Sequence, residues 1–380
     1  MTNKKFKLAA MSLATAVAVS AVGPSASAVT YYLGDGSVTV DKDDTRGAYS
    51  YQGEDGSEEH RTYVNEDEAD HGVINVKGGN APTEDVLPST DNSDNGTEET
   101  TPTDTTTDSS GNNAENSPTA ETTTGNTITV KEDVKDATIV VEGVNVDTST
   151  QTEVPVDAKE DKTIIKVGEG ADVDLTVKDS NLTTGGNGID IGVNLKDDDD
   201  NKETNVDLTL DNTKINLTEN ATAGINARDN SDVDITLKGD NTIDGSEAID
   251  KVTEGGGHDI SKDNVNIEGI RVGGEGASDS SDASEGANTK LTISGGVEKT
   301  ETAETDTEET ESSAGGSLTI SDTTGGLVMA DGSDVEITDG ANVTIEETKT
   351  SGSTQAGRGV TQHGDLTLSL IHISEPTRLG

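Results

Sequence analysis

Three acidic residues recur along the chain, and each is followed two positions later by a threonine. The pairs are Asp174 and Thr176, Asp207 and Thr209, and Asp234 and Thr236. Carboxylate and hydroxyl oxygens accept hydrogen bonds from sugar hydroxyls, and carboxylates also bind hard cations such as Ca²⁺. These six residues are therefore candidates for carbohydrate binding. The alternative is a solvated, charged face that discourages unwanted strand association, and the pattern leaves both open.

Arg228 and Arg271 are the other candidates for carbohydrate binding. Each lies in or directly after a segment that begins with Gly-Ile. A guanidinium could be the cation that a polysaccharide lyase needs beside its substrate, whereas pairing with a neighbouring acid is the alternative role. The histidines have no metal-binding or triad spacing, and the chain has no cysteine. The sequence therefore favours binding over catalysis.

Calcium is a candidate cofactor because some acidic residues are closely spaced. Its candidate ligands are Asp190 and the run Asp197, Asp198, Asp199 and Asp200. Asp190 ends the segment Gly-Gly-Asn-Gly-Ile-Asp, which matches the start of a calcium-binding nonapeptide repeat. No tandem copy follows, and a glycine turn explains the segment equally well. A run of aspartates is also compatible with a simple solvated loop, because a calcium site needs a defined ligand geometry.

The elements that position these residues are segments in which apolar and polar residues alternate. Residues 173–177, 206–210 and 233–237 repeat one such pattern about every thirty residues, as stacked repeats do. Two further short strands follow in a fixed order, at 215–217 and 224–227 after the second copy. Three strands per repeat, separated by Gly, Asn and Asp turns, predict an all-β fold, the right-handed parallel β-helix. An antiparallel sandwich would not need the same order to return.

In such a coil the apolar residues point inward, and the Asp and Thr residues point outward. Aligning the last apolar residue of each strand predicts an inner column of Val141, Val177, Leu210, Leu237, Ile293, Ile320 and Ile337. It also predicts an outer row of Thr176, Thr209, Thr236, Thr292 and Thr319 beside the three aspartates. Carboxylates about 4.8 Å apart repel by about 1 kcal/mol per pair at the dielectric of water. The short last interval predicts that residues 334–338 lie on a different face.

Composition limits the classes of protein and of partner. Hydrophobic residues make up 28% and aromatic residues 2% of 380, which excludes a large globular core. The formal net charge of −49 makes nucleic acids and anionic lipid surfaces unsuitable partners, because binding them requires clustered cations. Without cysteine the chain forms no disulfide, so stability must come from stacked repeats. We expect a monomer.

The chain divides into five regions. Residues 1–28 have the charged start, apolar stretch and Ala-Ser-Ala end of a signal peptide, which predicts a secreted protein with no membrane span in the mature chain. Residues 29–80 form a small β-rich unit, either an accessory unit or a detached first coil. Residues 81–126 are a disordered linker rich in Thr, Ser, Asp, Glu and Pro. The β-helix covers residues 127–366.

Residues 367–380 have a different origin in our interpretation. The segment Leu368 to Arg378 resembles the translation of a common sequencing adapter, and it carries the only proline of the last two hundred residues. A genuine terminal strand is the alternative. If the segment is an artefact, the natural protein continues, and a surface anchor or further coils would follow.

The order of motifs from Leu208 to Ile243 resembles that of secreted bacterial proteins with a pectin-lyase-like right-handed β-helix. The similarity is greatest to the carbohydrate-binding and adhesin-like surface proteins of Gram-positive gut bacteria. The resemblance implies a secreted or cell-surface protein that binds extracellular polysaccharide, or a host or cell-wall glycan, with Ca²⁺ as a cofactor of some relatives. Because all five Tyr and the one Phe precede residue 64, a sugar site after the linker would depend on polar residues.

Two other functions stay open at this point. The same fold carries polysaccharide lyases and hydrolases, so catalysis is the first alternative. A structural stalk that presents another domain is the second alternative.

Overall fold

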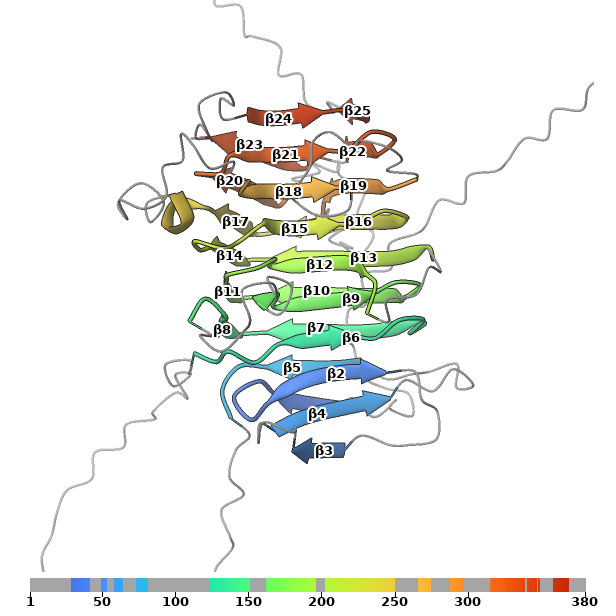
Figure 1. Ribbon diagram of the computed structural model, residues 1–380, viewed down its shortest axis with the longest axis vertical. Helices are drawn as coiled ribbons and strands as arrows, with labels where there is room; N and C mark the ends of the chain where they lie inside the picture. Colours follow the sequence, from blue (N-terminus) through green and yellow to red (C-terminus); the bar gives the residue numbers. More distant parts are fainter. Residues whose placement is uncertain are drawn as a thin grey trace, which may run out of the picture.

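A computed structural model describes residues 29–41, 49–52, 58–63, 73–80, 123–150, 162–195, 202–249, 266–274, 288–296, 315–338, 340–346, 348 and 358–368. These residues form a solenoid in which three β-sheets run along one axis (Figure 1). A short helical turn covers residues 246–249. No helix in the described part of the chain is long and apolar enough to cross a membrane.

Each sheet takes one strand from successive coils. The nine-strand sheet contains β1 (Val29–Tyr32), β5 (Val73–Lys77), β7 (Ala137–Glu142), β10 (Asp172–Lys178), β13 (Thr204–Asp211), β16 (Ser231–Lys238), β19 (Lys290–Gly295), β22 (Asp334–Thr338) and β25 (Asp365–Leu368). The six-strand sheet contains β8 (Asn145–Asp147), β11 (Asn181–Thr184), β14 (Lys214–Leu217), β17 (Asp240–Asp244), β20 (Ser317–Ser321) and β23 (Asn342–Glu346). The ten-strand sheet contains β3 (Tyr49–Gln52), β4 (Glu58–Tyr63), β2 (Ser37–Asp41), β6 (Ile128–Val130), β9 (Ile165–Gly168), β12 (Ile189–Val193), β15 (Ala223–Ala227), β18 (Glu268–Val272), β21 (Gly325–Met329) and β24 (Arg358–Gln362).

The strand pairing confirms the predicted parallel β-helix with three strands per coil. One coil runs from β13 to β14 to β15, and the next begins at β16. Neighbouring coils pair in parallel, as β10, β13 and β16 do, and the one antiparallel pair in the described residues joins β3 to β4. Equivalent residues of successive coils are therefore direct neighbours, which turns each repeated position of the sequence into a row along the solenoid.

The core is a narrow column of aliphatic side chains inside the coils. In β10, β13 and β16 the inward residues are at most 1% exposed, namely Val173, Leu175, Val177, Val206, Leu208, Leu210, Val233, Ile235 and Leu237. Each stacks on its equivalent in the neighbouring coil. Because the column is continuous, even a chain with few apolar residues buries most of the aliphatic side chains among the residues described.

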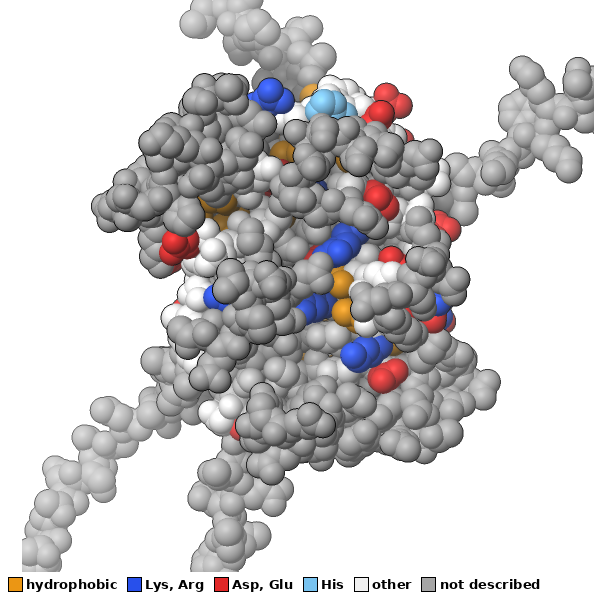
Figure 2. Space-filling view, viewed as in Figure 1, with side chains coloured by type: hydrophobic (Ala, Val, Ile, Leu, Met, Phe, Trp, Pro, Cys, Tyr) orange, Lys and Arg blue, Asp and Glu red, His pale blue; other side chains and the backbone are white. Residues whose placement is uncertain are grey.

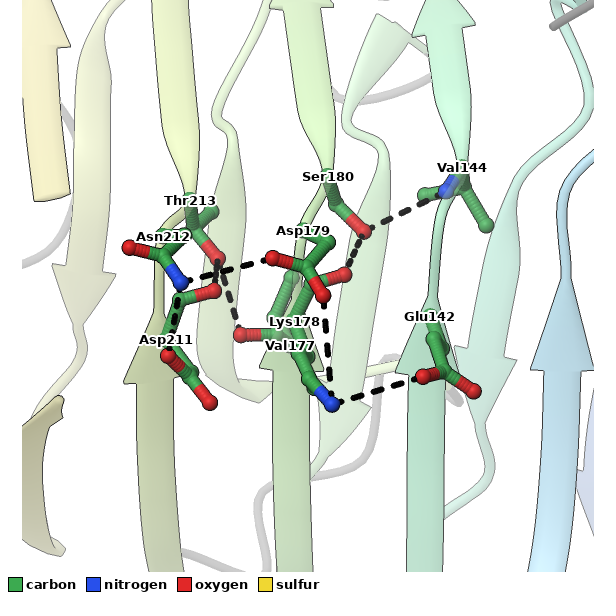
Figure 3. Close-up of polar contacts among 9 residues, drawn as sticks. All are labelled: Glu142, Val144, Val177, Lys178, Asp179, Ser180, Asp211, Asn212 and Thr213. Atoms are coloured by element: carbon green, nitrogen blue, oxygen red, sulfur yellow. Dashed lines mark hydrogen bonds and ion pairs between the residues drawn. The ribbon is translucent and has the colours of Figure 1, made fainter. Parts of the chain in front are cut away.

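A tight corner joins the nine-strand sheet to the six-strand sheet in several coils (Figure 3). One residue at this corner has a left-handed backbone, namely Gly143 (φ 62°), Asp179 (φ 47°), Asn212 (φ 52°) or Gly239 (φ 59°). Asp, Asn and Gly tolerate this conformation better than other residues. The predicted turns of Gly, Asn and Asp residues between strands are confirmed at this corner.

Buried polar side chains hold this corner together. Asn241 is 1% exposed; its Oδ1 accepts a bond of 2.9 Å from the Thr213 backbone N–H. Its Nδ2 lies 3.0 Å from the Lys238 carbonyl and 3.1 Å from the Ser317 carbonyl. The Thr213 hydroxyl, in turn, donates to the Val177 carbonyl of the previous coil at 2.8 Å (Figure 3). These side-chain bonds link successive coils in addition to the backbone bonds at the corner.

The predicted inner column is wrong in its later coils. Ile293 pairs with Ile235 instead of Leu237, and Gly295 occupies the place opposite Leu237. Ile320 belongs to β20 of the six-strand sheet and pairs with Ile243. The alignment failed because alternation has the same period in all three sheets, so an apolar residue at a strand end identifies neither the sheet nor the register.

The predicted outer threonine row is also wrong in its last two members, for the same reason. Thr292 pairs with Asp234, whereas Ser294 pairs with Thr236 and continues the row. Thr319 pairs with Thr242 in the six-strand sheet. Residues 334–338 were expected on a different face, but they form β22, which returns to the nine-strand sheet beside β19. In the sequence, residues 296–316 lie between β19 and β20, whereas only a few residues lie between the corresponding strands of the coils before, so the interval resembled a whole coil.

Strands from residues 29–80 pair directly with the following coils. β5 pairs with β7, and β2 pairs with β6, both in parallel. Their inward residues Leu33, Val38, Val40, Ile74 and Val76 belong to the same core cluster as the rest of the solenoid. This unit is therefore attached to the β-helix, and the detached-coil interpretation was wrong. At the end of the expected linker, Thr124 forms a parallel bridge with Val146.

Several sequence predictions lie outside the described residues. They are the signal peptide over 1–28, the linker up to residue 122, the aspartate run 197–200 and most of the adapter-like segment. The first residues of that segment, Thr367 and Leu368, are described and pair with Glu336 and Ile337 at the end of β25.

Candidate functional site

The predicted aspartates and threonines lie in two parallel rows on the outside of the nine-strand sheet. Asp174, Asp207 and Asp234 are direct neighbours in β10, β13 and β16, and we call them the acidic row. Thr176, Thr209 and Thr236 form the threonine row beside it. All six side chains are exposed or half-buried. The predicted rows are thus confirmed across these three coils, whereas sugar binding by them stays a prediction.

The acidic row concentrates negative charge. Partial burial raises the pKa of Asp207, and the neighbouring carboxylates of Asp174 and Asp234 raise it further. Burial also raises the pKa of Asp172 and Asp232 on the same strands. Because these pKa values are raised, the charged forms of the carboxylates make the folded state less stable at neutral pH.

A second row on the same sheet is arranged differently. Its members are, in order along the axis, Lys77, Glu142, Lys178, Asp211 and Lys238. Charges therefore alternate from coil to coil, and Lys178 Nζ lies 3.5 Å from Glu142 Oε1 (Figure 3). Opposite charges on facing strand positions stabilise a sheet, and like charges destabilise it. The same strands thus place compensated charge in one row and uncompensated charge in the acidic row.

Replacing Asp207 with asparagine is expected to stabilise the protein by about 1 kcal/mol at pH 7, because it removes two carboxylate repulsions that salt and solvent screen below the value for an isolated pair. The pKa of Asp207 is raised in the folded chain, so the repulsion disappears once the carboxyl is protonated. The gain should therefore fall to zero near pH 3, below the unfolded pKa of about 3.9. Urea unfolding of both proteins at the two pH values measures this difference. Asp211→Asn is the matched control, because Asp211 lies between two lysines and its loss should not stabilise. An equal gain for both variants would contradict the account.

A different set of charged residues meets on the ten-strand sheet. We call Asp190, Asn226, Arg228, Glu268 and Arg271 the charged cluster. Asp190, Asn226 and Arg271 are neighbours in β12, β15 and β18, since Asp190 pairs with Asn226 and Asn226 with Arg271. Figure 2 shows Lys and Arg side chains near the middle of one face of the solenoid, at the level of β9, β12 and β15 in Figure 1. In a chain of net charge −49, such a gathering of cations is unusual.

Asp190 is the centre of one half of the cluster, and its side chain is 1% exposed. Arg228 binds it with both Nε and Nη2, each at 2.9 Å. Asn226 Nδ2 donates to Asp190 at 2.9 Å, and Asn187 Nδ2 donates at 2.8 Å. Four N–H groups therefore occupy the two carboxylate oxygens. This arrangement neutralises a buried charge and ties two coils together.

Glu268 and Arg271 form the other half. Arg271 Nε lies 2.9 Å from Glu268 Oε2, and Arg271 Nη2 donates to Oε1 at 3.3 Å. Burial raises the pKa of Glu268, whereas the Arg271 guanidinium lowers it. Both arginines proposed for carbohydrate binding are thus paired with acids, which was the alternative interpretation of each.

The described residues offer no set of ligands for calcium. No group of three or more His, Cys, Asp or Glu residues suited to a metal ion is present among them. Asp190 could bind calcium only by giving up the four N–H groups described above. The run Asp197 to Asp200 lies outside the described residues, so calcium binding there stays a prediction.

Sequence reasoning missed three members of this neighbourhood, namely Asn187, Asn226 and Glu268. A signal for Asn226 was present, because it follows Gly-Ile as Asp190 and Arg271 do, which marks an outward position of the same sheet. Glu268 precedes the glycine of this motif, and nothing in the pattern indicated that Arg271 would turn back to it.

The fold and these surfaces define a class, the parallel β-helix proteins with charged rows on their outer faces. No family model, curated protein or solved structure matched the chain. The architecture therefore rests on the strand pairing, and the pectin-lyase-like resemblance rests on the motifs alone.

Proposed function

We propose that this chain is a secreted or cell-surface, non-catalytic β-helix protein that binds extracellular glycans on the outer faces of its coils. The observation that carries the proposal is the acidic row with its threonine row. Partial burial and the two neighbouring carboxylates raise the pKa of Asp207, so its charge makes the folded state less stable at neutral pH, although the same strands compensate charge elsewhere. A costly arrangement that packing does not require is a candidate for function.

The geometry of the rows suits a repeating polymer. A glycan that lies along the solenoid would meet an Asp and a Thr in each of three successive coils, about 4.8 Å apart. Carboxylates accept hydrogen bonds from sugar hydroxyls, and threonine hydroxyls both donate and accept. Polar contacts of this kind would replace the aromatic platforms that the chain lacks after residue 64.

Charge favours neutral glycans over acidic ones. With a net charge of −49 and an acidic row at the surface, the protein would repel a uronate polymer unless Ca²⁺ bridged the two sets of carboxylates. We therefore expect neutral polysaccharides to bind with or without Ca²⁺, and uronate polymers to bind only with it.

Affinity gel electrophoresis of the full chain tests this proposal. Gels would contain a neutral xylan, mannan or galactan, or polygalacturonate, each run with Ca²⁺ and with a chelator. At least one neutral polysaccharide should slow the protein in both conditions. Asp207→Ala should weaken that binding by about tenfold, the size of one lost hydrogen bond to a charged group, whereas Asp211→Ala should not. A protein that no polysaccharide slows in either condition would rule the proposal out.

Catalysis is the second candidate, and one pair of residues favours it. Burial raises the pKa of Glu268, and Arg271 lies beside it, so a potential base and a cation are adjacent. A lyase would release unsaturated sugars from polygalacturonate, which absorb ultraviolet light. Absorbance that does not rise above a protein-free blank, with Ca²⁺ present, would exclude this activity on that polymer.

A further inference from the structure

We propose that the charged cluster is a binding subsite for the adjacent hydroxyls of a neutral sugar, with Asn226 as the hydrogen-bond acceptor. This inference rests on the proposed function and assigns to it a second surface and a ligand chemistry.

Asn226 has a buried hydrogen-bond acceptor to which no described residue donates. Asn226 is 5% exposed, and its Nδ2 donates to Asp190. Its Oδ1 is buried and receives no hydrogen bond from the residues that the structure describes. Buried carbonyl oxygens are nearly always paired, because leaving one unpaired costs free energy. The Oδ1 atom is therefore suited to a hydroxyl donor from outside the chain.

Amides on the six-strand sheet are paired from coil to coil, although Asn216 lies opposite Thr183 and not opposite Asn181. There Asn216 Nδ2 donates to Asn181 Oδ1 at 2.8 Å, and Asn181 Nδ2 donates to Asn145 Oδ1 at 3.1 Å. At the equivalent step beyond Asn226 the neighbour is Arg271, which has donors available. Side-chain amides of neighbouring coils can therefore hydrogen-bond to one another in this fold, but the Oδ1 of Asn226 receives no such bond from the described residues.

Arg271 does not reach Asn226 because it is turned to Glu268. Its side chain is 14% exposed, with Nε 2.9 Å from Glu268 Oε2. That oxygen is a second buried acceptor to which no hydrogen bond is donated in the described residues, although it lies in ion-pair contact. Arg271 and Arg228, 14% and 23% exposed, are the accessible members of the cluster. A ligand would approach between them.

The charges of the cluster determine the ligand class. The two guanidiniums and two carboxylates of the cluster cancel, and Lys166 adds a positive charge beside Asp190 in the preceding coil. An anionic sugar would find both guanidiniums already paired, and a cation would be repelled by them. A neutral hydroxyl can donate to Asn226 Oδ1 and also accept from Arg271, so adjacent hydroxyls match the unpaired groups.

Calorimetric titration of the full chain with xylohexaose, mannohexaose, cellohexaose and hexagalacturonate, all with chelator, tests the inference. At least one neutral hexasaccharide should bind, and hexagalacturonate should not. Asn226→Ala should weaken the neutral ligand about tenfold, because it removes one buried hydrogen-bond acceptor. Asn216→Ala is the matched control, since it removes an amide that is already paired, and it should change affinity less than about twofold.

The outcomes separate the two proposals. If the wild type binds no hexasaccharide, both proposals fail. If a neutral ligand binds and Asp207→Ala weakens it while Asn226→Ala does not, the inference fails and the proposed function stands. Tighter binding of hexagalacturonate than of every neutral ligand would also overturn the inference. Should Asn226→Ala unfold, Arg271→Lys provides the second variant. It keeps the charge but loses the planar donor group, and it should weaken the neutral ligand similarly.

Discussion

Replacing Asp190 with alanine is expected to lower the free energy of unfolding by about 3 kcal/mol, the largest loss expected of any single substitution in the charged cluster. The carboxylate is 1% exposed, and it is the partner that neutralises the guanidinium of Arg228. Without it, a positive charge that is only 23% exposed would lack its bidentate partner. The amide groups of Asn187 and Asn226 would lose their acceptor as well. Equilibrium unfolding in urea measures the change.

A double substitution separates the loss of pairing from the loss of volume. Asp190→Leu with Arg228→Met removes both charges, so it should recover much of the stability that Asp190→Ala loses, because no unpaired charge remains. Arg228→Met alone should destabilise, because it leaves the buried carboxylate without its cation. If Asp190→Ala unfolds at the same urea concentration as the wild type, the buried pair does not join the coils. If the single and double variants lose the same free energy of unfolding, lost packing and not an unpaired charge causes the destabilisation.

Replacing Asn241 with alanine is expected to lower the free energy of unfolding by about 2 to 3 kcal/mol. Its amide accepts from the Thr213 N–H and donates to the carbonyls of Lys238 and Ser317. The substitution would leave the Thr213 N–H without its acceptor at a buried corner and would remove a donor from both carbonyls, of which that of Lys238 keeps the Asn212 N–H. The loss should resemble that of a core residue, although no apolar contact is removed. Thermal and urea unfolding measure it.

The control for this prediction is Asn216→Ala. Asn216 is half-buried, and its Nδ2 donates to two side chains, Asn181 and Thr183, and to no backbone group. The loss should be about 0.5 to 1 kcal/mol, the usual worth of such a bond. If both asparagine variants lose the same stability, the backbone bonds of Asn241 are not what holds the corner.

The architecture of this protein could be predicted from local patterns. Alternation in residues 206–210, the turn at Asn212 and the Gly-Ile strand at 224–227 each specify one part of a coil, and their repeated order specifies stacking. The rows of Asp174, Asp207 and Asp234 followed from that order, because equal spacing within a repeat becomes direct pairing in the fold.

Register beyond residue 290 could not be predicted in the same way. The strand with Thr292 ends in Ser294 and Gly295, so its last apolar residue is two positions earlier than in the preceding strands. The insertion before β20 then gave Ile320 the spacing of a complete coil, although β20 is the next strand of the same coil and belongs to the six-strand sheet. Spacing alone cannot distinguish a long corner from a whole turn, because the alternating pattern is identical on every side.

The charged cluster was predicted only in fragments. Asp190 was assigned to calcium, and Arg228 to sugar, yet the two form one bidentate pair across neighbouring coils. Their contact depends on long side chains reaching between coils, which the strand pattern does not specify. Glu268 and Arg271 are three residues apart, but their pairing requires the guanidinium to turn back along its own strand.

A crystal structure of the chain with the neutral oligosaccharide that binds it most tightly is the most direct test of the central claim. Sugar is expected on the outer faces of the coils, with hydroxyls in hydrogen-bond contact with the acidic row or with Asn226 and Arg271. Sugar bound only at the ends of the solenoid, away from both sets of residues, would contradict it.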